Sequence, residues 1–217
     1  MVLLNSKTWN RARLSIVAVV ALALAIPALA PLIPSAFAQT PRDFPISPNP
    51  PQAGPKGLAF SLDTLFGALK IAPDEASAKA IEDRIWAIWM SSDSDTCNLL
   101  MSRVKDATED KDYDLAIKLL DAIVTVKPDY VEAWNRRATL HYINHEYGRA
   151  LADIREVLVR EPRHFGALAG LGLILQDIGD DKHALEAYQA ALAIDPHLRN
   201  VPDTVKTLRE KVEGRDI

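Results

Sequence analysis

The chain has 217 residues, of which 48% are hydrophobic and 6% aromatic, and it contains a single cysteine. A chain of this length and composition can bury one medium-sized core, which excludes a collagen-like, a disordered or a disulfide-stapled protein. The 29 acidic residues outnumber the 25 basic ones, and the first 38 residues hold three basic side chains and no acid. The remainder is therefore acidic, and we expect no non-specific binding to nucleic acid.

The first 38 residues have the three parts of an export signal. Lys7, Arg11 and Arg13 precede an uncharged apolar run over residues 14–26, and Ala36-Phe37-Ala38 then supplies an A-x-A cleavage site. We expect a signal peptide over residues 1–38 that is cleaved between Ala38 and Gln39, which places the mature chain outside the cytoplasm without a stable membrane span. The alternative is an uncleaved anchor, because the stretch over residues 14–38 is weakly polar enough to cross a bilayer.

The next segment, residues 39–57, contains six prolines and little apolar content. Such a composition buries too little surface to offset the entropy of ordering, so we predict an extended linker. A polyproline ligand is the alternative reading.

Residues 58–96 read as a helical hairpin. Apolar residues recur at spacings of three and four in two runs, and Pro73-Asp74-Glu75 between them is a helix-start signal. We expect this hairpin to be a degenerate N-terminal repeat. Trp86 and Trp89 are read as packing residues, with weak self-association through them as the alternative if they are uncovered.

Two residue types recur in phase every 34 residues beyond the hairpin. The recurring residues are Pro128, Pro162 and Pro196, together with Ala116, Ala150 and Ala184. They define three blocks over residues 97–130, 131–164 and 165–198. Each block predicts two antiparallel helices, in which small residues let the backbones approach and proline ends the second helix.

This pattern resembles the tetratricopeptide repeat. The matching residues are Trp134, Ala138, Ala150 and Pro162 in the second block, Leu171, Gly172, Ala184, Tyr188 and Pro196 in the third, and Ala116, Leu120 and Pro128 in the weaker first block. The resemblance implies an all-α solenoid. An amphipathic run over residues 199–217 predicts a capping helix that ends near Gly214.

Three residues have structural expectations of their own. Arg137 stands at the seventh position of its block, which is usually apolar, and a lone buried guanidinium is costly, so we predict an ion pair with Asp153. Cys97, the single cysteine, is predicted to be a buried packing residue.

The search for catalytic chemistry gives little. His141 and His145 lie four residues apart but lack an evident third metal ligand, and Asp110, Asp112 and Asp114 lack the glycine of a calcium loop. No nucleophile motif is present. We therefore expect neither enzyme activity nor a cofactor. The alternative is a metal-dependent or enzyme-accessory protein with a site between the hairpin and the repeats, built from His141, His145 and His183.

What remains is a surface. The family resemblance implies that positions 2, 5, 9 and 12 of each block face a concave groove that binds a peptide or a helix. Those positions, together called the groove residues below, hold Asn98, Met101, Lys105 and Thr108; Glu132, Asn135, Thr139 and Tyr142; and Gly166, Ala169, Leu173 and Gln176.

Together these features predict a non-enzymatic scaffold for a protein or peptide partner in the periplasm of a Gram-negative bacterium. The signal and the block that begins near Trp134 are similar to small exported tetratricopeptide proteins of alphaproteobacteria linked to cell-envelope integrity. The link to the envelope is implied by that resemblance alone.

Overall fold

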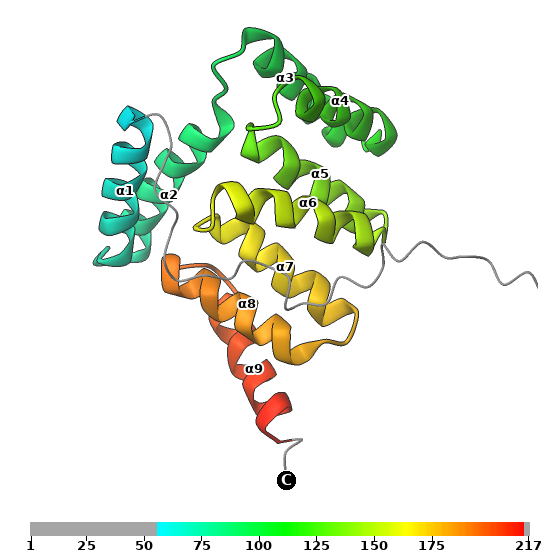
Figure 1. The fold of residues 1–217 in the computed structure, drawn as a ribbon. Coiled ribbons are helices and arrows are strands. Elements are labelled where there is room, and N and C mark those ends of the chain that lie inside the picture. Colours follow the sequence, from blue (N-terminus) through cyan, green and yellow to red (C-terminus); the bar gives the residue numbers. More distant parts are fainter. Residues whose placement is uncertain (1–55, 215–217) are drawn as a thin grey trace, which may run out of the picture. The chain divides into compact units, whose positions relative to one another are not determined.

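A computed structural model describes residues 56–214, with side chains from Leu62 onward. The predicted signal peptide over residues 1–38, its cleavage site and residues 39–55 of the predicted linker lie outside the described residues. The described part is all-α, with nine helices and no strand (Figure 1). Among these residues no helix combines the length and the apolar character that crossing a membrane requires.

Six helices form three helical hairpins in the predicted repeat register. They are α3 (Asp95–Glu109), α4 (Tyr113–Val126), α5 (Val131–Ile143), α6 (Tyr147–Arg160), α7 (Phe165–Asp177) and α8 (Asp181–Ile194). The second helix of each repeat ends two residues before the recurring proline. Because proline cannot continue a helix and disfavours helical backbone in the residue before it, its spacing sets the repeat length.

The turn inside each repeat is the same at the level of the backbone. Lys111, His145 and Gly179 stand at position 15 of their repeats and adopt left-handed backbone conformations, with φ of 60°, 58° and 85°. The residue that follows donates its backbone N–H to the carbonyl five residues back at 2.8 Å in all three repeats. The aspartates of the first turn serve this geometry, since the side chain of Asp112 caps α4 by accepting from the N–H of Leu115 at 3.1 Å.

The interior follows the predicted pairing of small and large residues. Gly172 on α7 faces the ring of Tyr188 on α8 so closely that an added Cβ would lie 2.8 Å from it. Cys97 is fully buried in the core of the first repeat, as predicted. After the third repeat, α9 (Val201–Glu213) packs along α8 with Val201, Val205 and Leu208 buried, and its C-cap is Gly214.

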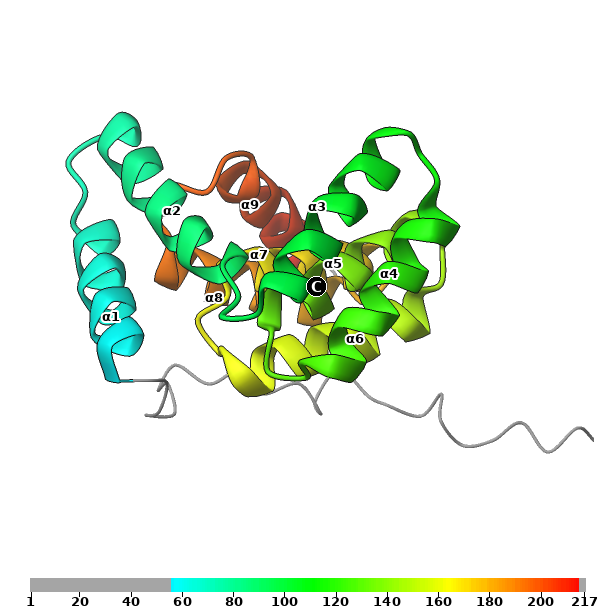
Figure 2. The same ribbon diagram turned by 90° about the horizontal axis from the view of Figure 1, so that it is seen from above.

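The N-terminal hairpin forms from α1 (Lys56–Lys70) and α2 (Glu75–Met90), and Asp74 caps α2 by accepting from the N–H of Ser77 at 2.7 Å. Its place in the fold differs from that of a repeat stacked ahead of α3. The main partners of α1 and α2 beyond one another are α8 and α5. Figure 2 shows the hairpin on one side of α5–α8 and the α3–α4 repeat on the other. The physical reason is an aromatic cluster that the hairpin shares with the third repeat, described next.

Candidate functional site

The hairpin packs against the start of α7 through aromatic rings. Trp89 stacks on His164, with ring centroids 4.0 Å apart and ring planes 10° apart, and it also contacts Phe165. Trp86 contacts His164 and Phe165 edge-on. An added Cβ at Gly166 would lie 2.8 Å from the Trp86 ring, so the absence of a side chain there lets α2 approach. Gly166 is a groove residue, and the hairpin therefore covers one end of the predicted groove.

A buried polar cluster lies beneath this contact. His164 is fully buried and caps α7 by accepting from the N–H of Ala167 at 3.0 Å, which leaves its Nε2 3.4 Å from the carboxylate of Glu132. Glu132 is itself only 2% exposed, and it also accepts from Asn135 at 3.0 Å and lies 3.0 Å from Nε of Arg136. These contacts compensate the cost of burying a carboxylate and hold the first turn of α5 in place.

Two neighbouring pockets of about 400 Å³ each open beside this cluster. The first is lined by Trp86 of the hairpin and by Val104, Thr108, Glu132, Asn135, Arg136, Thr139, Leu140 and Ile143. The second is lined by Ala87, Met90 and Ser91 of the hairpin end and by Asn98, Met101, Ser102, Lys105 and Arg136. Arg136 belongs to both, and its Nη2 lies 2.9 Å from Sδ of Met90. The two pockets are together called the α3–α5 pockets below.

The structure gathers the groove residues of the first two repeats. Seven of them line the α3–α5 pockets: Asn98, Met101, Lys105, Thr108, Glu132, Asn135 and Thr139. The remaining positions lie elsewhere on the same helices. Tyr142 donates its hydroxyl to Asp177 of the third repeat at 2.9 Å, Gln176 lies 3.4 Å from the hydroxyl of Tyr188, and Leu173 is 40% exposed. Ala169 is partly buried on α7.

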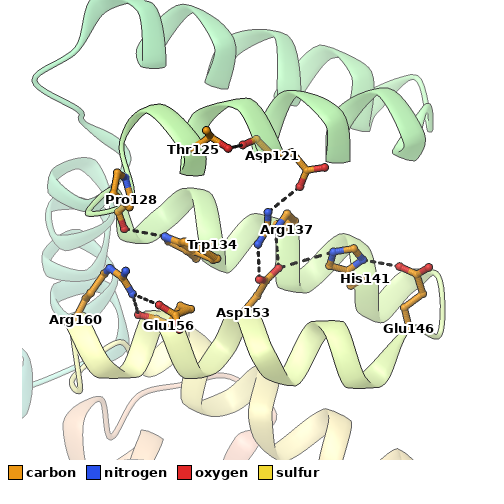
Figure 3. A network of polar contacts seen from close by, with 10 residues as sticks. All are labelled: Asp121, Thr125, Pro128, Trp134, Arg137, His141, Glu146, Asp153, Glu156 and Arg160. Atoms are coloured by element: carbon orange, nitrogen blue, oxygen red, sulfur yellow. Dashed lines mark hydrogen bonds and ion pairs between the residues drawn. The ribbon is translucent and has the colours of Figure 1, made fainter. Parts of the chain in front are cut away.

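The predicted ion pair between Arg137 and Asp153 is confirmed (Figure 3). Nε and Nη2 of Arg137 donate to the two carboxylate oxygens of Asp153 at 2.8 and 2.7 Å. Nη1 donates to Asp121 of the preceding repeat at 2.7 Å, and the guanidinium lies over the Trp134 ring at 4.7 Å. The hydrogen bonds from Asp153 raise the pKa of Arg137 above its ordinary value. This fork joins three helices, α4, α5 and α6, and it lies outside the α3–α5 pockets.

The histidines of the alternative metal site have separate partners. His141 is buried and contacts Glu146 at 2.6 Å, His145 lies 3.2 Å from the Tyr147 hydroxyl, and His183 contacts Asp180 at 2.8 Å. Within residues 62–214 no three His, Cys, Asp or Glu side chains form a group that could hold a metal ion. The histidine that contacts the hairpin is His164, which the sequence reading did not single out.

Sequence reasoning also missed the hairpin's share of the pockets. Trp86 and Met90 form one wall, and Arg136 stands at position 6, outside the four groove positions. Trp86, Trp89 and Met90 do share one side of an amphipathic helix, which is a signal for contact but not for the partner. Trp89 is only 6% exposed and Trp86 is half-buried, so the covered state of both side chains favours the packing reading over self-association through them.

The fold and the pockets define an α-solenoid of helical hairpins with a recognition face on its first helices. The sequence model of the tetratricopeptide repeat family matches residues 142–198. A TPR repeat-containing protein of Rhizobium etli is 42% identical over 153 residues, which cover 70% of this chain and 75% of that protein. The chain belongs to the tetratricopeptide repeat family.

Other similarities are more distant. The small glutamine-rich tetratricopeptide repeat-containing protein 2 of Saccharomyces cerevisiae is 32% identical over 89 residues, which span 41% of this chain and 26% of the yeast protein. The first TPR of Spaghetti (RPAP3), solved with the HSP90 peptide SRMEEVD, is 15% identical and has a TM-score of 0.53 over 56% of this chain and 96% of that one. MamA is 19% identical, with a TM-score of 0.52 over 66% of this chain and 81% of that structure. These solved structures share the fold.

Proposed function

We propose that this protein is a non-enzymatic scaffold that binds an extended peptide or a helix of a partner protein in the α3–α5 pockets. Tetratricopeptide domains are protein–protein interaction scaffolds that bind peptides, and one neighbour in fold was solved with a bound peptide. The observation that carries the proposal is the convergence of seven groove residues on two adjoining pockets that share Arg136.

The chemistry of the pockets suits a peptide with an apolar anchor. Trp86, Leu140 and Ile143 supply apolar surface to the first pocket, while Thr108, Asn135 and Thr139 supply groups that can meet a peptide backbone. The hairpin closes one end, since Trp86 covers Gly166. A ligand would therefore run along α3 and α5 and would contact the hairpin as well as the repeats.

The test is to fill the first pocket without disturbing the buried cluster. Thr139 is exposed, and its hydroxyl contacts only the backbone oxygen of Asn135 among the described residues, so Thr139→Trp should leave the fold intact. The matched control is Val159→Trp on α6, at a side chain that is 54% exposed and outside both pockets. Cross-linking in intact cells followed by mass spectrometry should capture a partner with the native chain and the control, and lose it with Thr139→Trp. Equal capture by both variants would show that the partner binds elsewhere.

We further propose that the protein acts in the periplasm of a Gram-negative bacterium and supports the cell envelope. The support is the n-region, apolar run and A-x-A site of residues 1–38, together with the family resemblance. Cell fractionation with N-terminal sequencing tests the location. A periplasmic chain that begins at Gln39 is expected, and a membrane-bound chain that keeps residues 1–38 would favour the anchor. Sensitivity of a deletion strain to detergents tests the envelope role.

A further inference from the structure

The first repeat has a face that its neighbours leave uncovered. Elsewhere in the array the first helix of a repeat packs on the second helix of the preceding one, as α5 does on α4 and α7 on α6. The hairpin that precedes α3 packs on α5 and α8 instead, and in the part of the chain that the structure describes α3 packs along α4 and along no other helix. The α3–α4 pair therefore ends the stack (Figure 1).

An apolar stripe of α4 occupies this uncovered end. Leu115, Leu119, Ala122 and Val126 follow one another at spacings of four, three and four, which places them on one side of the helix. Leu115 is 45% exposed and Val126 is 67% exposed. The same repeat positions in α6 hold Arg149, Asp153, Glu156 and Arg160. Because a terminal repeat is expected to present a polar outer face, an apolar stripe here calls for a partner.

The neighbouring helix adds a cation to the stripe. Arg103 on α3 stands at position 7, as Arg137 does on α5, and Leu99 on the same helix is 58% exposed. Arg137 is held by Asp153 of its own repeat and by Asp121 of the preceding one. At the place of Asp153 the first repeat has Leu119, and Arg103 forms no ion pair with any residue that the structure describes. The carboxylate that a preceding helix would offer is the missing part.

We propose that this terminal face, formed by Leu99, Arg103, Leu115, Leu119, Ala122 and Val126, binds an amphipathic helix of a partner protein. The helix lies where the second helix of a preceding repeat would lie, and it presents an apolar stripe to α4 and a carboxylate to Arg103. The site continues the interface that the repeats already use among themselves. A second copy of this chain is the poorer occupant, because its own stripe holds no carboxylate for Arg103. The proposal does not rest on the α3–α5 pockets.

The native array supplies a probe for the site. Because α4 fills the equivalent place against α5 and directs Asp121 to Arg137, a helix-stabilised synthetic peptide with the sequence of residues 113–126 should bind the full chain. Fluorescence anisotropy should show saturable binding. Reversing one charge, through Asp121→Lys in the peptide or Arg103→Glu in the protein, should weaken binding about 5-fold, near the upper end for a partly exposed ion pair. Combining both reversals should restore the affinity.

Three further results locate the site and would decide against it. Val126→Asp should abolish peptide binding, whereas the control Val159→Asp should leave it unchanged. Absence of saturable binding, or an affinity that ignores both Arg103→Glu and Val126→Asp, would overturn the proposal. Sedimentation that shows a concentration-dependent dimer, lost with Val126→Asp, would assign the face to a second copy and overturn the partner helix. A photo-cross-linker at Ala122 that joins residues 39–55 of the same chain would overturn it equally.

Discussion

The three repeats and the N-terminal hairpin are held in place by different kinds of contact. Neighbouring repeats meet through the same positions each time, so that small residues such as Ala150 and Ala184 recur at every close approach of two helices. The hairpin meets the third repeat through contacts that occur once, above all Trp89 on His164 and Trp86 on Gly166. Repeated contacts distribute stability along the array, whereas the hairpin depends on a few large side chains.

The largest effect is expected where the hairpin docks. Trp89→Ala removes a nearly buried ring that contacts Phe66, Trp86, His164 and Phe165, a loss of about 3–5 kcal/mol. Because the repeats keep their own contacts, hydrogen exchange should show α1 and α2 losing protection while α5–α8 keep theirs. The control is Trp89→Phe, since the buried indole N–H has no hydrogen-bond partner among the described residues. Loss of protection across the array would show that the repeats need the hairpin to fold.

The next effect falls inside the array. Asp153→Ala leaves the guanidinium of Arg137 with Asp121 alone, and both members of the broken pair are largely buried, so unfolding in urea should cost about 3 kcal/mol less. Asp121→Ala removes an exposed partner and should cost less than about 1 kcal/mol. Equal losses for the two variants would contradict the unequal burial of the two carboxylates.

A smaller effect tests whether the repeat positions are interchangeable. Gly172→Ala forces a methyl group against Tyr188 and should lower the free energy of unfolding by roughly 1–3 kcal/mol. The second repeat uses Ala138 and Ile154 at the same two positions. The double variant Gly172→Ala with Tyr188→Ile reproduces that pair and should recover most of the loss. Failure to recover would show that the third repeat has a packing of its own.

The turns offer a paired test of about 1 kcal/mol. Gly179→Ala puts a side chain on a residue with φ of 85° and should destabilise the protein by roughly that amount. Lys111→Gly relieves the same conformation at the equivalent turn and should be stabilising. Thermal unfolding of the two variants should shift in opposite directions, and parallel shifts would contradict the argument from backbone conformation.

The smallest effect concerns pH and the hairpin. Burial and the nearby Asp195 raise the pKa of Glu82 on α2 above its ordinary value. A carboxyl whose pKa is higher in the docked state favours docking below its ordinary pKa, and this contribution disappears as the pH rises through the raised value. Glu82→Gln should therefore increase the protection of α2 at neutral pH and flatten its pH dependence, in hydrogen exchange corrected for intrinsic rates. An unchanged pH dependence would exclude Glu82 as its source.

Much of the array could be predicted because its rules are local. The spacing of Pro128, Pro162 and Pro196 set the repeat length, and the prediction that Arg137 pairs with Asp153 needed only their positions in the two helices of one repeat. The groove residues were gathered as predicted in the first two repeats, although Glu132 is buried in a polar cluster. Trp86, which forms one wall of that site, could be predicted only as a packing residue.

The sequence was sufficient for the all-α repeat fold, its register and its capping helix, because helix formation and the contact between adjacent helices depend on residues close together in the chain. It was not sufficient for the place of the hairpin, the shape of the pockets or the uncovered face of α3 and α4. Each of these depends on which distant surfaces meet, as α2 meets α5 and α1 meets α8. Periodicity carries no information about a contact that occurs once, so tertiary packing alone decides where such a contact forms.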